Sequence, residues 1–249
     1  MKRWAALLLA AGIWGAGAGT LHAAEDAFAR GAKLYEEGKY KNAAQEFEKF
    51  LDNERSSAAG LYNLGNCYFK LGERGKAVWA YEKALLLDPR DEDLRWNLEL
   101  LRKQLTDKQG ASGGLRNWIA RKTERLGADE IAWAFSAAVG IFSLWILAAA
   151  LVPFVRPAVS RTMLPVLVLI AITGAAAGVR WAELRYPAAV VTDREVYVRY
   201  GPSKEATRAF LLHEGAKVRI LKESSGWLSV EFGMGEKGWL ERETVLRVR

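Results

Sequence analysis

The sequence has few of the residues that bind metals, form disulfides or carry out catalysis. Its 249 residues include one cysteine, Cys67, and two histidines, His22 and His213. A single cysteine excludes an intramolecular disulfide. If His22 belongs to a targeting segment, one histidine and one cysteine are too few ligands for a zinc site. We therefore expect no metal and no cofactor.

The sequence also lacks the patterns typical of enzymes. It has no glycine-rich phosphate loop of the P-loop form and no nucleophile with a base at a recognisable spacing. The paired carboxylates Glu36 and Glu37 are ordinary charges of a solvated helix face. We predict that the protein is not an enzyme. A hydrolase acting on cell-wall material is the alternative.

The positive charge is not gathered in one patch. The formal net charge is +7, and the excess lies beside hydrophobic segments, where Lys and Arg set membrane topology and contact headgroups. Nucleic-acid binding needs a concentrated basic surface. Since neither polar part of the chain offers one, we expect no nucleic-acid partner.

Residues 1–24 predict a secretory signal peptide. Lys2 and Arg3 precede an apolar stretch, and Ala23 and Ala24 provide small residues for cleavage. The stretch is short and rich in glycine, which disfavours a spanning helix. The exact cleavage site stays open, and an uncleaved anchor is the alternative. In either case the segment that follows is exported.

Residues 24–57 and 58–91 form two helical repeats. They superpose at a shift of 34 residues, which is the period of the tetratricopeptide repeat (TPR). In the second copy, Gly65 and Ala77 are small enough for two antiparallel helices to approach closely, and Pro89 ends the second helix. Residues 92–105 add a helix that covers the open end of the stack. A TPR domain is therefore expected over 25–105.

TPR stacks bind peptides in a concave groove lined by the first helix of each repeat, and this resemblance implies which side chains face a partner. For Tyr62, Phe69 and Trp96, packing between helices is the alternative. Cys67 is expected in the core. The candidate groove residues are Tyr62, Asn63, Asn66, Phe69, Lys70, Trp96 and Asn97, with Phe28 and Tyr35 from the first repeat.

Two apolar runs predict transmembrane helices at 131–155 and 162–180. Residues 106–130 precede them as a flexible linker and a basic amphipathic segment, either a helix lying in the membrane interface or a simple basic flank. No lone ionisable residue interrupts either run, which argues against a transporter or a channel.

Export of the first polar part, followed by two spans, places both polar parts in the periplasm of a bacterial inner-membrane protein. The expected short loop 156–161 is then cytoplasmic, and Arg156 and Arg161 agree with the positive-inside rule. The basic residues within 116–125 and Arg180 with Arg185 conflict with this rule. The export signal is given more weight.

Residues 188–249 predict a small all-β barrel of five to seven short strands separated by turn residues. The segment from Val196 to Ser203 resembles the opening signature of bacterial SH3 domains, and the sequence from Lys237 to Leu240 resembles a later one. For Trp227 and Trp239 a place in the core is the alternative, and for Arg199 the alternative is that it only braces the turn at Gly201 and Pro202. The candidate binding residues are Tyr197, Arg199, Tyr200, Trp227 and Trp239.

The fold class is thus multidomain: an all-α TPR repeat, a two-helix transmembrane hairpin and an SH3-like barrel. Their order resembles that of the BatE-type proteins of the Bat (aerotolerance operon) family. The resemblance implies a periplasm-facing scaffold that works beside membrane proteins with von Willebrand A domains and a MoxR-type ATPase. A tether that binds peptidoglycan through the SH3-like domain is the alternative.

Overall fold

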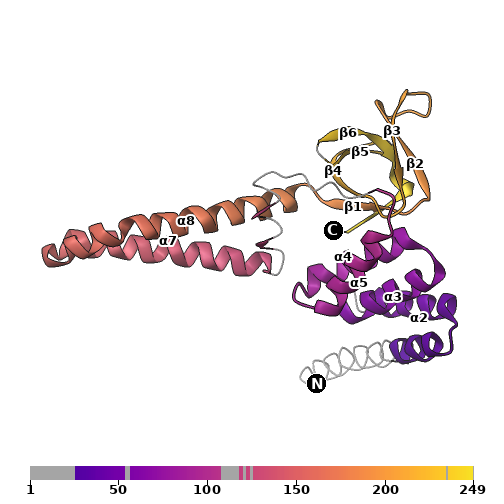
Figure 1. The fold of residues 1–249 in the computed structure, drawn as a ribbon, viewed down its shortest axis with the longest axis horizontal. Coiled ribbons are helices and arrows are strands. Elements are labelled where there is room, and N and C mark those ends of the chain that lie inside the picture. Colours follow the sequence, from indigo (N-terminus) through magenta and orange to yellow (C-terminus); the bar gives the residue numbers. More distant parts are fainter. Residues whose placement is uncertain are drawn as a thin grey trace, which may run out of the picture. The chain divides into compact units, whose positions relative to one another are not determined.

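The computed structural model describes residues 26–53, 57–107, 118–119, 122–123, 126–233 and 235–248. The predicted signal peptide and most of the predicted linker and amphipathic segment lie outside these residues. The chain divides into two compact units (Figure 1). One combines the N-terminal helices with the C-terminal strands, and the other holds the apolar hairpin.

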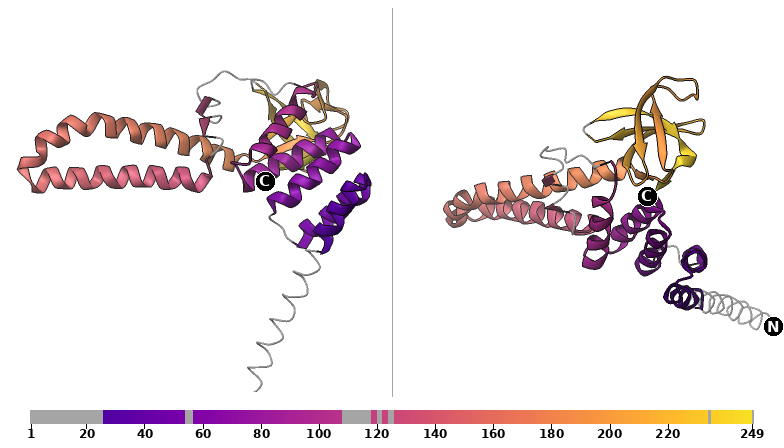
Figure 2. Two further views of the ribbon diagram at one scale, coloured as in Figure 1. Left: turned by 60° about the horizontal axis from the view of Figure 1, so that its bottom comes forward. Right: turned by 45° about the vertical axis from the view of Figure 1, so that its right-hand side comes forward.

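The N-terminal half is a stack of antiparallel helices, as the repeat pattern predicts (Figure 2). A helix over 26–36 is followed by α2 (Tyr40–Asn53), α3 (Ala58–Leu71), α4 (Arg74–Leu87) and α5 (Glu92–Lys103). The ends follow local chemistry. The Ser57 hydroxyl caps α3, the Asp91 carboxylate caps α5, and Gly72 ends α3 in the left-handed region at a φ of 78°.

Small residues bring neighbouring helices together, so that aromatic rings fill the space between them. A Cβ atom on Gly65 would lie 2.6 Å from the Tyr81 ring, and one on Gly31 would lie 2.9 Å from the Phe47 ring. Both rings are fully or almost fully buried. Cys67 is also buried, as expected, and burial raises the pKa of its thiol to about 12. The thiol is therefore unreactive at neutral pH.

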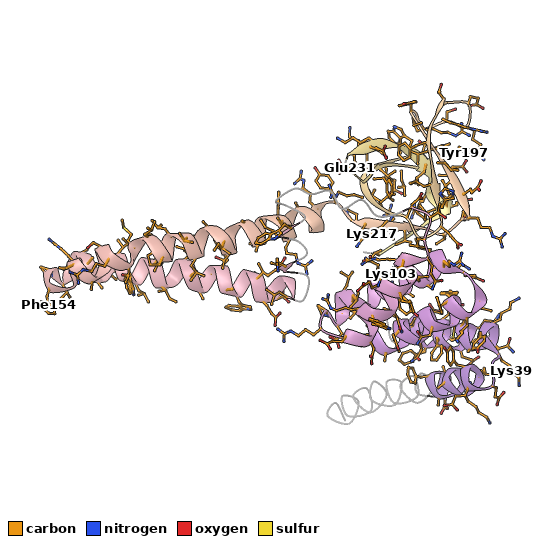
Figure 3. The ribbon with its side chains drawn as sticks, in the orientation of Figure 1. Lys39, Lys103, Phe154, Tyr197, Lys217 and Glu231 are labelled. Atoms are coloured by element: carbon orange, nitrogen blue, oxygen red, sulfur yellow. The ribbon has the colours of Figure 1, made fainter. Side chains whose placement is uncertain are left out.

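The hairpin consists of α7 (Ala128–Leu151), the short helix η1 (Pro153–Val155) and α8 (Arg156–Arg185). Both long helices are long and apolar enough to cross a membrane. Only 6% of the most apolar stretch of each is buried, so their apolar surface faces outward rather than into a protein core. Phe154, which lies at the reversal, is 91% exposed (Figure 3).

The chain reverses at residues 152–155, and not within the expected loop 156–161. Val152 is extended, as is usual before a proline, and Pro153 begins η1. Pro157 then lies in the first turn of α8, where its missing N–H breaks no helical hydrogen bond. Residues 156–161 are therefore helical, and the second apolar helix begins before the expected residue 162.

The C-terminal half is one antiparallel sheet of seven strands in the order β3-β2-β6-β5-β4-β1-β7. Turns and short loops separate the strands. Gly215, between β3 and β4, and Gly226, between β4 and β5, adopt the positive φ angles that such turns need. The strands are β1 (Ala188–Val191), β2 (Glu195–Arg199), β3 (Arg208–His213), β4 (Lys217–Ser224), β5 (Trp227–Phe232), β6 (Glu236–Glu241) and β7 (Val245–Arg247).

The sheet encloses a core of alternating inward residues, including Val198, Leu212, Leu228, Val230 and Leu240. This seven-stranded sheet, the helical stack and the two apolar helices together confirm the predicted fold class.

We predict that Gly238→Ala destabilises the sheet by about 1–3 kcal/mol, the usual range for overpacking. A Cβ atom there would lie 2.4 Å from the Val198 side chain and 2.8 Å from the Arg199 carbonyl oxygen, and backbone cannot move away easily. Denaturant unfolding measures the effect. Gly201→Ala is the control, because its Cβ meets only an ordinary contact at 3.5 Å. Equal stability of the two variants contradicts the prediction.

Candidate protein-binding surfaces and the junction between helices and sheet

The helical stack and the sheet share a packed junction, which sequence reasoning left open. Val190 of β1 and Val248 belong to the same buried cluster as the helical core. Gly75 of α4 allows the approach, since a Cβ atom there would lie 2.5 Å from the Val191 carbonyl oxygen and 2.9 Å from Thr192 Cα. The second helix of the second repeat therefore packs directly against backbone of the sheet.

A buried carboxylate lies at this junction. Glu82 of α4 is 7% exposed and is the buried charged residue among those described. It accepts a hydrogen bond from Arg102 of α5 and, at 2.6 Å, one from the Lys217 ammonium group of β4. Burial raises the pKa of Glu82, but the two cations outweigh this, and the net pKa is lowered to about 2.

Two further contacts join the halves. The Asp107 carboxylate, just beyond α5, accepts the backbone N–H of His213 at 2.5 Å and lies 3.0 Å from Nδ1 of the same residue. The Trp79 indole N–H donates to the Arg247 carbonyl oxygen at 2.7 Å. Each contact satisfies a polar group at the end or edge of a strand, so the junction is specific as well as apolar.

Most of the predicted polar groove residues are held by neighbouring helices. The Asn97 amide donates to the Tyr62 hydroxyl at 3.1 Å, and the Tyr81 hydroxyl donates to Asn66 Oδ1 at 2.6 Å. The Asn63 amide donates to the Ala59 carbonyl oxygen of its own helix at 3.0 Å. The Tyr81–Asn66 bond therefore joins the two helices of the second repeat, and the Asn97–Tyr62 bond joins α3 to α5, whereas Asn63 bonds only within α3.

The remaining groove candidates differ in exposure. Phe69 is half-buried against the helical core, as are Phe28 and Tyr35. Lys70 is exposed, and Trp96 of α5 is 65% exposed. An indole so open to solvent on the first-helix side of the stack is the strongest candidate contact there. The junction uses α4, the second helix of its repeat, so Trp96 and Lys70 stay accessible.

Strand register brings four of the five predicted SH3-like residues together. Tyr197 and Arg199 alternate with the inward residues of β2, and Arg199 pairs with Trp239 of β6. Trp227 of β5 is diagonal to Trp239, because β5 and β6 pair Ser229 with Trp239. These residues share the outer face of the sheet. Trp227 and Trp239 are half-buried and are not members of the inner core cluster.

The contacts of this outer face combine aromatic and basic groups. The Arg208 guanidinium lies 4.0 Å from the centroid of the Tyr197 ring, a cation–π contact. Arg199 donates to the Ala206 carbonyl oxygen at 2.7 Å and so braces the loop after β2. Tyr200, at the start of that loop, is 71% exposed. Lys217 also points away from the core, but its strand β4 is separated from β2 by β5 and β6, so Tyr197 lies away from the contact between Glu82 and Lys217 (Figure 3).

Sequence reasoning missed the junction residues Glu82, Asp107, Lys217 and the partner of Tyr197, Arg208. The sequence does not indicate that a charged residue on a helix will pair with a charged residue on a strand far away in the chain. Gly75 was the available signal, since a glycine inside a helix often marks a close approach. Within the described ranges, no three His, Cys, Asp or Glu side chains are grouped as metal ligands.

We predict that the free energy of unfolding falls more in the wild type than in Glu82→Gln between pH 6 and pH 3. The lowered pKa of Glu82 means that its ion pairs stabilise the fold fully above its unfolded pKa of about 4.5 and are lost as the pH falls toward about 2. The difference should be about 1–2 kcal/mol, measured by denaturant unfolding. The two proteins share all other carboxyl groups. An equal decrease in the free energy of unfolding in both therefore contradicts the prediction.

We also predict that Gly75→Ala weakens the junction although alanine favours a helix by about 1 kcal/mol over glycine. The added methyl group would clash with backbone atoms of the sheet, which cannot move aside as a flexible side chain could. Amide hydrogen exchange over β1 should become at least about tenfold faster. Gly140→Ala is the control, since its Cβ meets nothing within 4 Å. Unchanged protection of β1 contradicts the packing described.

Two parts of the chain match known families. Residues 58–91 match the tetratricopeptide repeat, and residues 192–246 match the bacterial SH3 domain. No curated protein matches the chain. The first match covers α3 and α4, and the second covers the sheet from β2 onward, so β1, which packs on α4, lies outside both. The two matched domain types indicate a protein that binds protein segments.

Proposed function

We propose that the protein is a membrane-anchored scaffold of the bacterial inner membrane, with both binding domains in the periplasm. The TPR groove takes one segment of a partner protein, and the outer face of the SH3-like sheet takes another. The apolar hairpin holds both domains at the membrane. No step of this function needs catalysis, and we expect assays of wall-hydrolase activity on the purified protein to be negative.

The observation that supports this proposal most is the junction itself. Contacts from Glu82, Trp79 and Asp107 use α4 and the segment after α5 on the helical side, and β4, the β7 edge and the end of β3 on the sheet. They leave Trp96 and the Tyr197–Trp239 face accessible. A receptor with two accessible surfaces in one compact unit binds two segments at a fixed spacing, which raises the effective concentration of the second.

The junction also bears on topology. The hairpin residues lie between Asp107 and Ala188 in the chain, yet residues on both flanks pack together. Two spans return a chain to the side of the membrane from which it left, so this packing supports placing both flanks on one side. The resemblance to the Bat family makes von Willebrand A domain membrane proteins and a MoxR-type ATPase system the first partners to test.

A cell-wall tether is the second candidate. The outer face presents Trp227, Trp239, Tyr197 and Tyr200, and flat aromatic rings suit the apolar faces of sugars as well as peptides. In this case the SH3-like domain binds peptidoglycan while the TPR groove recruits proteins. Sedimentation of the full chain with purified wall material separates the candidates, since the scaffold predicts no retention and the tether predicts retention that Trp239→Ala abolishes.

We predict that Trp96→Ala and Trp239→Ala each reduce recovery of protein partners, in a crosslinked pulldown from intact membranes, by at least about tenfold. Exposed tryptophans at a binding site commonly contribute more than about 2 kcal/mol. The two variants should lose different partners or different segments of one partner. Phe154→Ala is the control, because Phe154 is 91% exposed but lies on the hairpin. Equal recovery from all three variants contradicts the scaffold.

A further inference from the structure

The two edges of the sheet differ in how far other parts of the chain cover them. The order β3-β2-β6-β5-β4-β1-β7 leaves β3 and β7 as edge strands. Edge strands offer unpaired N–H and C=O groups, which proteins usually cover or guard with charge. The β7 edge is covered, because Trp79 donates to the Arg247 carbonyl oxygen and Val248 is buried in the helical core.

The β3 edge is covered only at its end. Glu214 donates its N–H to the Arg194 carbonyl oxygen toward β2, and antiparallel residues alternate in direction. His213 and Leu211 therefore turn their N–H groups away from β2. The His213 N–H donates to Asp107, which shows the direction directly. Leu211 has no such partner among the described residues.

The rest of this edge suits an added strand. Leu211 pairs with Tyr197, and Ala209 is the extra residue of a bulge that faces no residue of β2. Residues 209–212 are all apolar, so no charge inside the strand guards it. Asp107 occupies the His213 end, which limits how far an added strand extends in that direction.

Charge on the edge favours one kind of occupant. Arg208 is exposed at the start of β3, and Arg199 lies opposite it on β2. At the other end Glu195 lies opposite His213, so positive charge is concentrated at the Arg199–Arg208 end. A side chain of an added strand that reaches this end would meet the exposed Arg208 guanidinium, with Arg199 one strand behind it, and a guanidinium group prefers a carboxylate.

We propose that the β3 edge binds an extended acidic segment of a protein partner by strand addition, through the Leu211 backbone and Arg208. This rests on the proposed function and names the chemistry of the segment that the SH3-like domain takes. Main-chain hydrogen bonds supply affinity, and Arg208 selects an acidic side chain. The partner can reach Leu211 without disturbing the junction, because Asp107 contacts only the His213 end of β3 and Trp79 contacts the opposite edge, at β7.

The test measures binding of two fluorescent synthetic peptides to the full chain in detergent micelles. One alternates valine with glutamate, and the other alternates valine with lysine. The wild type should bind the glutamate peptide at least about tenfold more tightly. Leu211→Pro should weaken binding about tenfold, as expected for one lost hydrogen bond, whereas Leu211→Val keeps the N–H and should bind normally. Arg208→Glu should reverse the preference.

Two controls keep the result interpretable. Proline is tolerated at an edge where the N–H faces solvent, and unfolding curves check that Leu211→Pro is folded. If it is not, the Arg208→Glu reversal decides. No binding of the glutamate peptide, or equal binding to Leu211→Val and a folded Leu211→Pro, overturns the proposal. Loss of partner recovery in Trp239→Ala together with full recovery in Leu211→Pro would retain the scaffold and reject strand addition.

Discussion

The arrangement of the soluble domains depends on one buried carboxylate. Glu82 has lost almost all contact with water, and an isolated carboxylate in that position would be strongly unfavourable. Arg102 from the same helical stack and Lys217 from the sheet both reach it. Without Lys217, the charge would be compensated by one helix neighbour alone. The Glu82 carboxylate of the helical stack is therefore paired with both of its cations only when the sheet packs against the helices. This requirement makes the docked arrangement specific.

This contact joins the helical stack and the sheet into one compact unit, and the apolar hairpin is inserted between them in the sequence. The surfaces around Trp96 of the helical stack and Tyr197 of the sheet remain accessible, since the junction uses other residues of α4, α5, β1, β4, the β7 edge and the end of β3. A partner that binds both surfaces meets them at a fixed spacing, and a partner that binds one surface does not compete with the junction.

Much of the fold could be predicted from sequence because its rules are local. Glycine and alanine at repeat positions, proline after α4, uncharged runs and alternating strands each follow from a short segment, and the observed strands lie close to the expected ones. The reversal of the hairpin was displaced because the expected loop was placed where Arg156 and Arg161 end the uncharged runs, although Arg156 and Pro157 lie in the first turn of α8.

The candidate sites were harder to predict, for a physical reason. Whether Asn66 faces a partner or Tyr81 depends on a hydrogen bond between two helices, and whether Trp239 lies inside or outside depends on strand register. The junction depends on pairs far apart in sequence, such as Glu82 with Lys217. No periodic pattern encodes such a pair, since each residue alone is an ordinary surface charge.

The most direct test of the account is a distance measurement between the helical stack and the sheet in the full chain, reconstituted in lipid. Spin labels on Asp93→Cys in α5 and Lys222→Cys in β4 serve this purpose, since both sites are exposed and buried Cys67 does not react. Pulsed electron paramagnetic resonance then reports the distribution of distances. A single narrow distribution, which broadens in Lys217→Met, is the predicted result. A broad distribution in the wild type would contradict the central claim that the two domains form one body.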